Sequence, residues 1–232
     1  MDSIEVKRFV TKEFYPAEAM KTLRTNVMFC GTDVRTIAVT SFSAAEGKST
    51  ISFQLAASLA QTGRKVLLLD ADLRKSVMAS SLRTKGTVEG LTHLLSGMAS
   101  LNEILTATDI PGLYVIFAGA RVPNSAEVLG SKTFSKLMSA LRETFDYVIV
   151  DAAPLGQVID CAVMAPIVDG VLMVVDSTRN SYKLERRMKA QLEKANGKIL
   201  GVVLNRVDMH DKTGYYGRTY GYGYGYGGEY GG

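Results

Sequence analysis

Short, wholly apolar runs alternate with longer amphipathic segments along most of the chain. An apolar, β-branched run without polar alternation predicts a strand buried on both faces, as in a parallel sheet. The segments between the runs place apolar residues at helical spacing. Because right-handed crossovers put helices on both faces, the pattern predicts an α/β fold with a doubly wound, mostly parallel sheet. Strands are expected at 37–40, 66–69, 113–117, 147–151, 170–176 and 199–204.

The first of these strands leads into a candidate phosphate-binding loop. A small polar loop follows residue 40, then Glu-Gly-Lys-Ser-Thr at 46–50, then a helical pattern over 50–60. Strand, loop, Gly-Lys-Ser and helix in this order predict a nucleotide site, because loop amides and a helix N-terminus attract anionic oxygens. Lys48 would reach the β- and γ-phosphates, and the Ser49 hydroxyl would hold Mg²⁺. The residues expected around the phosphates are Ala45, Glu46, Gly47, Lys48, Ser49 and Thr50. The alternative is a helix N-terminus that carries this triplet by accident.

The loop departs from the usual G-x-x-x-x-G-K-[ST] pattern. Phe42 stands where the first glycine is expected, and Ala44 and Ala45 stand where proline or glycine is common. An alanine in place of glycine costs little where φ is negative and more where φ is positive.

Two other strands are expected to end in carboxylates at the edge of the sheet where the phosphate loop begins. Asp70 and Asp72 follow the run at 66–69, and Asp151 ends the run at 147–151. The carboxyl ends of parallel strands form the ligand-binding edge of an open α/β sheet, so these side chains should lie beside the phosphate loop. There they could support Mg²⁺ and accept a proton. Alternatively, they form polar turns, since apolar strands often end in Asp.

The last strand ends in Asn205 and Arg206 at the same edge. Asn205 could read an adenine or ribose edge, or it could satisfy a loop. Elsewhere, Ser125 and Ser131 are candidate N-caps, for helices through residue 129 and residue 144.

An N-terminal helix is expected over about 16–30, with Pro16 in its first turn. Glu18, Lys21 and Arg24 lie one turn apart on its polar face. They form either a solvated stripe with i,i+3 pairs or a contact surface for another subunit.

The C-terminal segment 213–232 differs in composition from the rest, which we take as one domain, 1–212. It has no aliphatic residue, so it cannot build a core and is expected to be a flexible, disordered tail. A Gly-rich coil of about 24 residues has an r.m.s. span of roughly 25–30 Å, and the tail would start beside the nucleotide. The tail is either a low-complexity sticker or a set of phosphate acceptors. Its tyrosines are Tyr215, Tyr216, Tyr220, Tyr222, Tyr224, Tyr226 and Tyr230.

The composition limits the classes of function. A net charge of +4 over 232 residues gives no argument for nucleic acid. We see no run near the roughly 20 apolar residues of a membrane span and no signal peptide, so we expect a cytoplasmic protein. Cys30 and Cys161 have no metal-binding spacing and are expected to be free thiols. The two isolated histidines, His93 and His210, add no basis for a zinc site.

Taken together, the motifs resemble those of the bacterial tyrosine kinases of capsule and exopolysaccharide synthesis. These kinases are P-loop proteins of the MinD/ParA-like group. The resemblance covers nearly the whole chain and includes the Tyr-rich tail. The matching segments are 44–50 (Walker A), 67–75 (Walker A′), 147–154 (Walker B), 119–129 (a loop usually rich in proline) and 18–26 (a ring-assembly helix).

The resemblance implies an ATP- and Mg²⁺-dependent kinase. Lys48 would neutralise the phosphates, while Ser49, Asp70, Asp72 and Asp151 organise Mg²⁺, and Asp70 or Asp72 assists deprotonation of the tyrosine. Glu18, Lys21 and Arg24 would form contacts in a ring-shaped homo-oligomer, an octamer being the candidate size. The tail tyrosines would be phosphorylated in trans. The implied partners are a transmembrane polysaccharide co-polymerase adaptor, which holds the kinase at the inner membrane face, and a cognate tyrosine phosphatase.

Two other functions fit parts of the pattern. One is a MinD/ParA-type ATPase switch. The signature lysine of those proteins would stand at position 43, where this chain has Ser43. Such proteins also often end in a basic membrane helix, whereas segment 213–232 is rich in Gly and Tyr. The other is a non-catalytic ATP-binding regulator. The chain also departs from the kinase pattern at Lys21, where Arg is expected, and at Ser76, where Pro is common.

Overall fold

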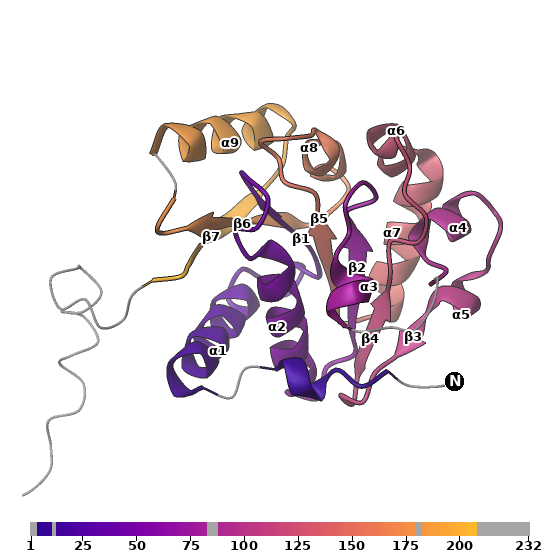
Figure 1. Cartoon of the computed structure of the whole chain (residues 1–232), viewed down its shortest axis with the longest axis horizontal. Coiled ribbons are helices and arrows are strands. Elements are labelled where there is room, and N and C mark those ends of the chain that lie inside the picture. The colour runs from indigo at the N-terminus through magenta and orange to yellow at the C-terminus, as the bar shows by residue number, and fades with distance from the viewer. Residues whose placement is uncertain (1–3, 11–12, 83–87, 180–181, 208–232) are drawn as a thin grey trace, which may run out of the picture.

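The computed structural model describes residues 4–10, 13–82, 88–179 and 182–207. A seven-stranded sheet in the order β3-β4-β2-β5-β1-β6-β7 runs through its centre (Figure 1). All neighbouring strands are parallel except β3 and β4. The doubly wound α/β fold is therefore confirmed. The strands are β1 Thr36–Ser41, β2 Val66–Ala71, β3 Thr106–Ala107, β4 Leu113–Ile116, β5 Tyr147–Ala152, β6 Gly170–Asp176 and β7 Ile199–Asn205.

Helices cover both faces of the sheet, which splits the core into two clusters. One cluster contains the apolar side of α2 and Val27 of α1, packed on β1, β2 and the neighbouring strands. The other contains residues from α4 to α9 on the opposite face. The central strands are buried on both sides for this reason. The helices are η1 Lys7–Phe9, α1 Phe14–Met28, α2 Lys48–Ala60, α3 Met78–Ser81, α4 Leu91–Leu95, α5 Leu101–Ile104, α6 Ser125–Leu129, α7 Lys132–Thr144, α8 Asp160–Met164 and α9 Tyr182–Lys194.

The strand register brings the motif-bearing ends together. Asp70 of β2 pairs with Asp151 of β5, and Val39 of β1 pairs with the same Asp151. Of these two strands with acidic ends, β5 lies directly beside β1, the strand that enters the phosphate loop, and β2 lies on the other side of β5. This arrangement follows from the crossover that inserts β5 between β1 and β2.

Some local expectations are wrong. The helix after the phosphate loop begins at Lys48, two residues before the expected start. Ser125 is not an N-cap: α6 begins at Ser125 with Asn124 before it, and the Ser125 hydroxyl is used elsewhere. Ser131 does cap α7, since its Oγ accepts the amide of Phe134 at 3.1 Å. The antiparallel strand β3 was not expected, because two residues carry no pattern.

The predicted tail, 213–232, lies outside the described residues. Within the described part of the chain, no helix is long and apolar enough to cross a membrane.

Candidate nucleotide-binding site

The phosphate loop joins the end of β1 to the start of α2 and uses two left-handed backbone positions. Gly47 has φ 94° and Ala45 has φ 63°. A Cβ on Gly47 would lie 2.2 Å from Nδ2 of Asn205, so both φ and space require glycine there. Ala45 carries a Cβ, which the left-handed conformation disfavours, so its backbone is strained by on the order of 1 kcal/mol. Alanine in place of glycine at position 45 therefore has the higher of the two expected costs, because φ is positive there.

The end of β7 braces the loop. Asn205 Nδ2 donates to the carbonyl of Glu46 at 2.9 Å, and Arg206 Nη2 donates to the carbonyl of Ala45 at 2.8 Å. Arg206 Nη1 also bonds Oδ2 of the buried Asp176 at 2.5 Å. Asn205 therefore serves the loop, one of the two roles that the sequence left open. Its contact with a nucleotide base or ribose stays a prediction.

Glu46 supports the loop from inside. It is buried, and its Oε2 accepts the amide of Phe42 at 3.1 Å. Farther along, Ser49 is half-buried and Thr50 is exposed in the first turn of α2. Amides at the start of this helix point toward the loop, as an anion site requires.

Lys48 lies at the centre of the site. Its Nζ is 3.3 Å from Oδ2 of Asp72, 3.3 Å from Oδ1 of Asp151 and 3.3 Å from Oγ of Ser49. Burial alone would lower the pKa of Lys48, but the carboxylates of Asp151, Asp72 and Asp70 outweigh it and raise the pKa. Lys48 is thus a fixed positive charge at the carboxyl ends of β2 and β5.

Asp151 is fully enclosed and is held by α2. Ser52 Oγ donates to its Oδ1 at 3.2 Å and to the carbonyl of Lys48 at 2.9 Å. Burial raises the pKa of Asp151, although Lys48, Ser49 and Ser52 pull in the other direction. One helical turn therefore supplies both the ammonium and the hydroxyl that hold this carboxylate.

Asp70 is a buried carboxyl with a strongly shifted pKa. The Ser76 hydroxyl donates to its Oδ2, and the amide of Asp72 donates to its Oδ1 at 3.2 Å. Burial, with a further contribution from the Asp151 charge, raises its pKa to about 7. Ser76, the departure from proline, supplies a partner that this carboxylate would otherwise lack.

The oxygen donors suit Mg²⁺, which prefers hard oxygen ligands. Among the described residues, no three acidic, histidine or cysteine side chains form a ready-made metal cage. Instead, Asp72 and Asp151 converge on the Lys48 ammonium, which shows that this pocket favours a cation. Since Mg²⁺ in phosphate sites commonly takes one or two carboxylates with phosphates and water, the residues fit the ion.

The structure adds residues that the motif search missed. Asp160, at the start of α8, has no exposed surface; its Oδ2 accepts from Ser125 Oγ at 2.5 Å and from Arg74 Nε at 3.4 Å. Its Oδ1 has no partner within the described part of the chain. Arg74 lies two residues after Asp72, so this cluster ties the Walker A′ segment to α6 and α8. Ser52 had a signal in its i+4 spacing from Lys48, whereas Asp160 had none.

The predicted subunit-contact residues lie on α1, away from the loop. Glu18 and Lys21 form an exposed i,i+3 pair at 2.6 Å. Arg24 Nη1 instead bonds the carbonyl of Ser58 at 3.1 Å and its Oγ at 3.2 Å, both on α2. Arg24 therefore also anchors α1 within its own chain.

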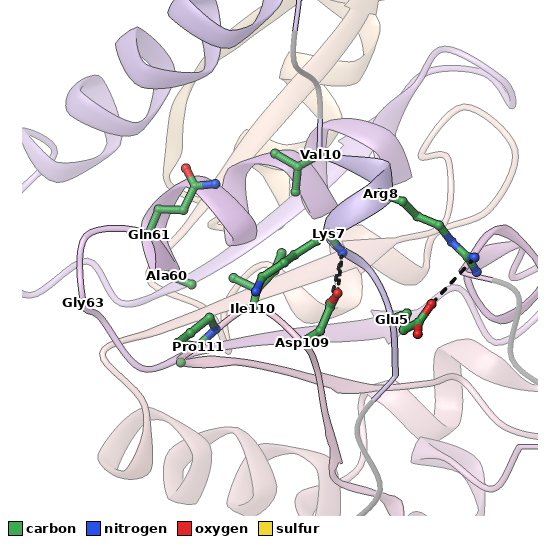
Figure 2. Close-up of a pocket in the computed structure, with 11 residues that line it drawn as sticks. Glu5, Lys7, Arg8, Val10, Ala60, Gln61, Gly63, Asp109, Ile110 and Pro111 are labelled. Atoms are coloured by element: carbon green, nitrogen blue, oxygen red, sulfur yellow. Dashed lines mark hydrogen bonds and ion pairs between the residues drawn. The ribbon is translucent and has the colours of Figure 1, made fainter.

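A cavity of about 1000 Å³ lies at the opposite edge of the sheet, beside the last residue of α2 (Figure 2). There Asp109 accepts the amides of Val6 and Lys7, which fixes the N-terminal segment. The cavity is separated from Lys48 by the length of α2, so it is not the nucleotide site.

The fold and the loop geometry define a P-loop nucleotide-binding protein, and comparisons identify its class further. Residues 34–199 match the profile of a family described as an AAA domain. Tyrosine-protein kinase CpsD of Streptococcus agalactiae is 40% identical over 198 residues, covering 85% of this chain and 84% of that protein. Succinoglycan biosynthesis transport protein ExoP of Rhizobium meliloti is 36% identical over 187 residues, covering 79% of this chain but 24% of that protein.

Solved structures with the same fold support this classification. The crystal structure of the chimerical protein CapA2B2 superposes with a TM-score of 0.81 and 31% identity, covering 88% of this chain and 92% of that one. The septum site-determining protein MinD from Pyrococcus horikoshii, at TM-score 0.63 and 22% identity over 77% of this chain and 73% of its own, shares the fold. The chain belongs to the bacterial tyrosine-protein kinases of the P-loop class.

Proposed function

We propose that this kinase transfers the γ-phosphate of ATP to tyrosines of its own C-terminal tail, in trans within a ring-shaped oligomer. The observation that carries the proposal is the placement of Lys48 between Asp72 and Asp151 beside the phosphate loop. This arrangement offers a cation for the phosphates and carboxylates for a proton. The phosphate acceptors are the tail tyrosines from Tyr215 to Tyr230 that the sequence provides.

In the transfer, the tyrosine oxygen forms a bond to the γ-phosphorus as the bond to the bridging oxygen of ADP breaks. Lys48 neutralises charge on the phosphate oxygens, and the loop amides orient them. Mg²⁺, held by Ser49 with Asp72 and Asp151, would supply further charge neutralisation.

The phenol proton passes to Asp70 or Asp72. A tyrosine pKa of about 10 makes a nearby acceptor necessary at neutral pH. Asp70 is suited to accept the proton by its pKa of about 7. Asp72 is suited by its accessibility, since Asp72 is 6% exposed while Asp70 has no exposed surface. The rate–pH profiles of Asp70→Asn and Asp72→Asn distinguish them, because only loss of the acceptor flattens the rising limb.

The regulated process would be capsule or exopolysaccharide synthesis and export. Support comes from the similarity to ExoP, which is named for succinoglycan biosynthesis and transport. A transmembrane co-polymerase adaptor would hold the kinase at the inner membrane face and activate it, and a tyrosine phosphatase would reset the tail. The CapA2B2 likeness is consistent with such an adaptor, since that structure is described as a chimera.

The test is intact mass after incubation with Mg-ATP, for the full chain and for a chain ending at Lys212. We expect several phosphate additions on the full chain and none on the shorter one. ATP consumption without any mass change would instead indicate a MinD/ParA-type ATPase switch. No change in either quantity, even with an adaptor peptide present, would favour the non-catalytic regulator.

A further inference from the structure

The outer edge of β7 has the features of a docking surface for another strand. β7 is the last strand of the sheet, pairs with β6, and has no further strand beside it in the described part of the chain. Two large apolar side chains on it face solvent: Val202 is 59% exposed and Leu204 is 41% exposed. Their partners on β6, Met173 and Val175, are buried beneath the helices on the α9 face, so Val202 and Leu204 lie on that face.

The backbone at the same two residues also points outward. The carbonyl of Asn205 accepts the amide of Ser177 at 3.0 Å, so the backbone groups of Asn205 face the β6 side. Backbone groups alternate in direction along a parallel-paired strand. The N–H and C=O of Val202 and Leu204 therefore point away from β6. Together, these residues offer open hydrogen-bonding groups and apolar surface, which is what strand addition uses.

The tail carries a segment with a matching pattern. Residues 220–226 read Tyr-Gly-Tyr-Gly-Tyr-Gly-Tyr, a strict period of two. In a strand, this period places all four tyrosines on one face and the glycines on the other. Its seven residues equal the seven of β7. Tyrosine favours strands, and aromatic side chains pack well against β-branched ones across neighbouring strands.

We propose that residues 220–226 add to the outer edge of β7 of the same chain as an antiparallel strand, with the tyrosine rings over Val202 and Leu204. The segment begins 15 residues after the end of β7 at Asn205, which leaves ample chain to reverse direction. Tethering gives an effective concentration on the order of millimolar, which favours the chain's own tail over a second copy. On the α9 face, the tyrosines nearest to Val202 and Leu204 are held against the sheet.

This docking would connect the tail to the phosphate loop. Leu204 directly precedes Asn205 and Arg206, whose side chains bond the carbonyls of Glu46 and Ala45. A strand that fixes the end of β7 also fixes these two braces. The inference rests on the proposed function only in taking these tyrosines as the phosphate acceptors.

The test is amide hydrogen exchange of the unphosphorylated full chain, without ATP, read residue by residue by NMR. The matched control is a full-length variant with the same composition, Tyr222→Gly, Gly223→Tyr, Tyr224→Gly and Gly225→Tyr, which breaks the alternation. We expect exchange at Val202 and Leu204 to be about 10-fold slower in the native chain than in this variant. A second variant, Val202→Ser with Leu204→Ser, should lose the protection of amides in 220–226.

Equal exchange in the native chain and in the rearranged-tail variant would overturn the proposal. Protection that rises with protein concentration would also overturn it, because it would assign the strand to a second copy. The exchange experiment contains no ATP, so equal exchange in the two chains would leave the kinase proposal unaffected. Likewise, an absence of tail phosphorylation with Mg-ATP would leave the docking proposal unaffected.

Discussion

The Nζ of Lys48 lies 3.3 Å from Oδ1 of Asp151, a residue 103 positions away along the chain. The phosphate-loop lysine is therefore bonded to the Walker B carboxylate. A nucleotide would offer this ammonium a second set of anionic oxygens. We therefore expect the removal of Lys48 to affect both catalysis and the stability of the protein without nucleotide.

Lys48→Met should abolish tail phosphorylation, with a loss of at least about 100-fold, because the phosphate charge is no longer neutralised. Intact mass after incubation with Mg-ATP measures this loss. The free energy of unfolding at pH 8 should fall by about 3–5 kcal/mol, because Asp72 and Asp151 lose their shared cation while buried. Urea unfolding followed by circular dichroism measures the second effect.

Lys136→Met is the matched control, since Lys136 is exposed on α7, away from the loop. It should change neither quantity beyond about 0.5 kcal/mol or a factor of two. Normal tail phosphorylation in Lys48→Met would refute the assignment of the phosphate site.

Ala45→Gly should stabilise the protein by about 0.5–1 kcal/mol. Ala45 has φ 63°, a conformation that glycine adopts without strain, and this relief exceeds the entropy that glycine adds to the unfolded chain. Ala44→Gly is the neighbouring control: Ala44 is not among the described residues with positive φ, so only the entropic cost applies. If both substitutions destabilise equally, the backbone strain at Ala45 is absent in solution.

The sequence predicted the sheet, and the edge at which its aspartates gather, for a physical reason. Apolar runs specify buried strands, and parallel strands ending in Asp70, Asp72 and Asp151 must bring these residues to one edge. The side-chain partners were not predictable in the same way. Asn205 bonds the loop carbonyl of Glu46 because the end of β7 lies beside the phosphate loop in the folded chain. Asp160 lies beside Arg74 only through tertiary packing.

The departures from the family pattern also needed the structure for their interpretation. Ala45 falls at a positive φ and is costly, whereas Ser76 donates to a buried carboxylate and is useful. Both positions look alike in sequence, as small residues in place of expected ones. Backbone conformation and burial, which the sequence does not carry explicitly, separate them.

Exchanging the charges of one ion pair would test the ring contact on α1. The double variant Glu18→Lys with Lys21→Glu keeps an i,i+3 pair within the helix, so the fold should be stable to within about 0.5 kcal/mol. A partner surface would now meet reversed charges. We therefore expect a smaller oligomer by light scattering and slower autophosphorylation at low protein concentration. Alanine at Arg24 is a poor test, because Arg24 also anchors α1 to Ser58 of α2. An unchanged mass and rate would place the contact elsewhere.

The titration of Asp70 should make the stability of the protein depend on pH. Burial raises its pKa to about 7 in the folded chain, so the folded state keeps a proton that the unfolded state releases above about pH 4. The free energy of unfolding should therefore fall as pH rises from about 4 to about 7, and then level off.

Asp70→Asn removes this dependence while leaving an acceptor for the Ser76 hydroxyl. Compared with the native chain, the variant should be nearly equal in stability at pH 4 and more stable at pH 8 by on the order of 4 kcal/mol, since about three pKa units at about 1.4 kcal/mol each separate the folded and unfolded carboxyl. Urea unfolding in the presence of EDTA, across this pH range, measures the difference, with Asp33→Asn as an exposed control. A stability gap that stays constant with pH would show that Asp70 is already ionised throughout, and that Lys48 and Ser76 offset its burial.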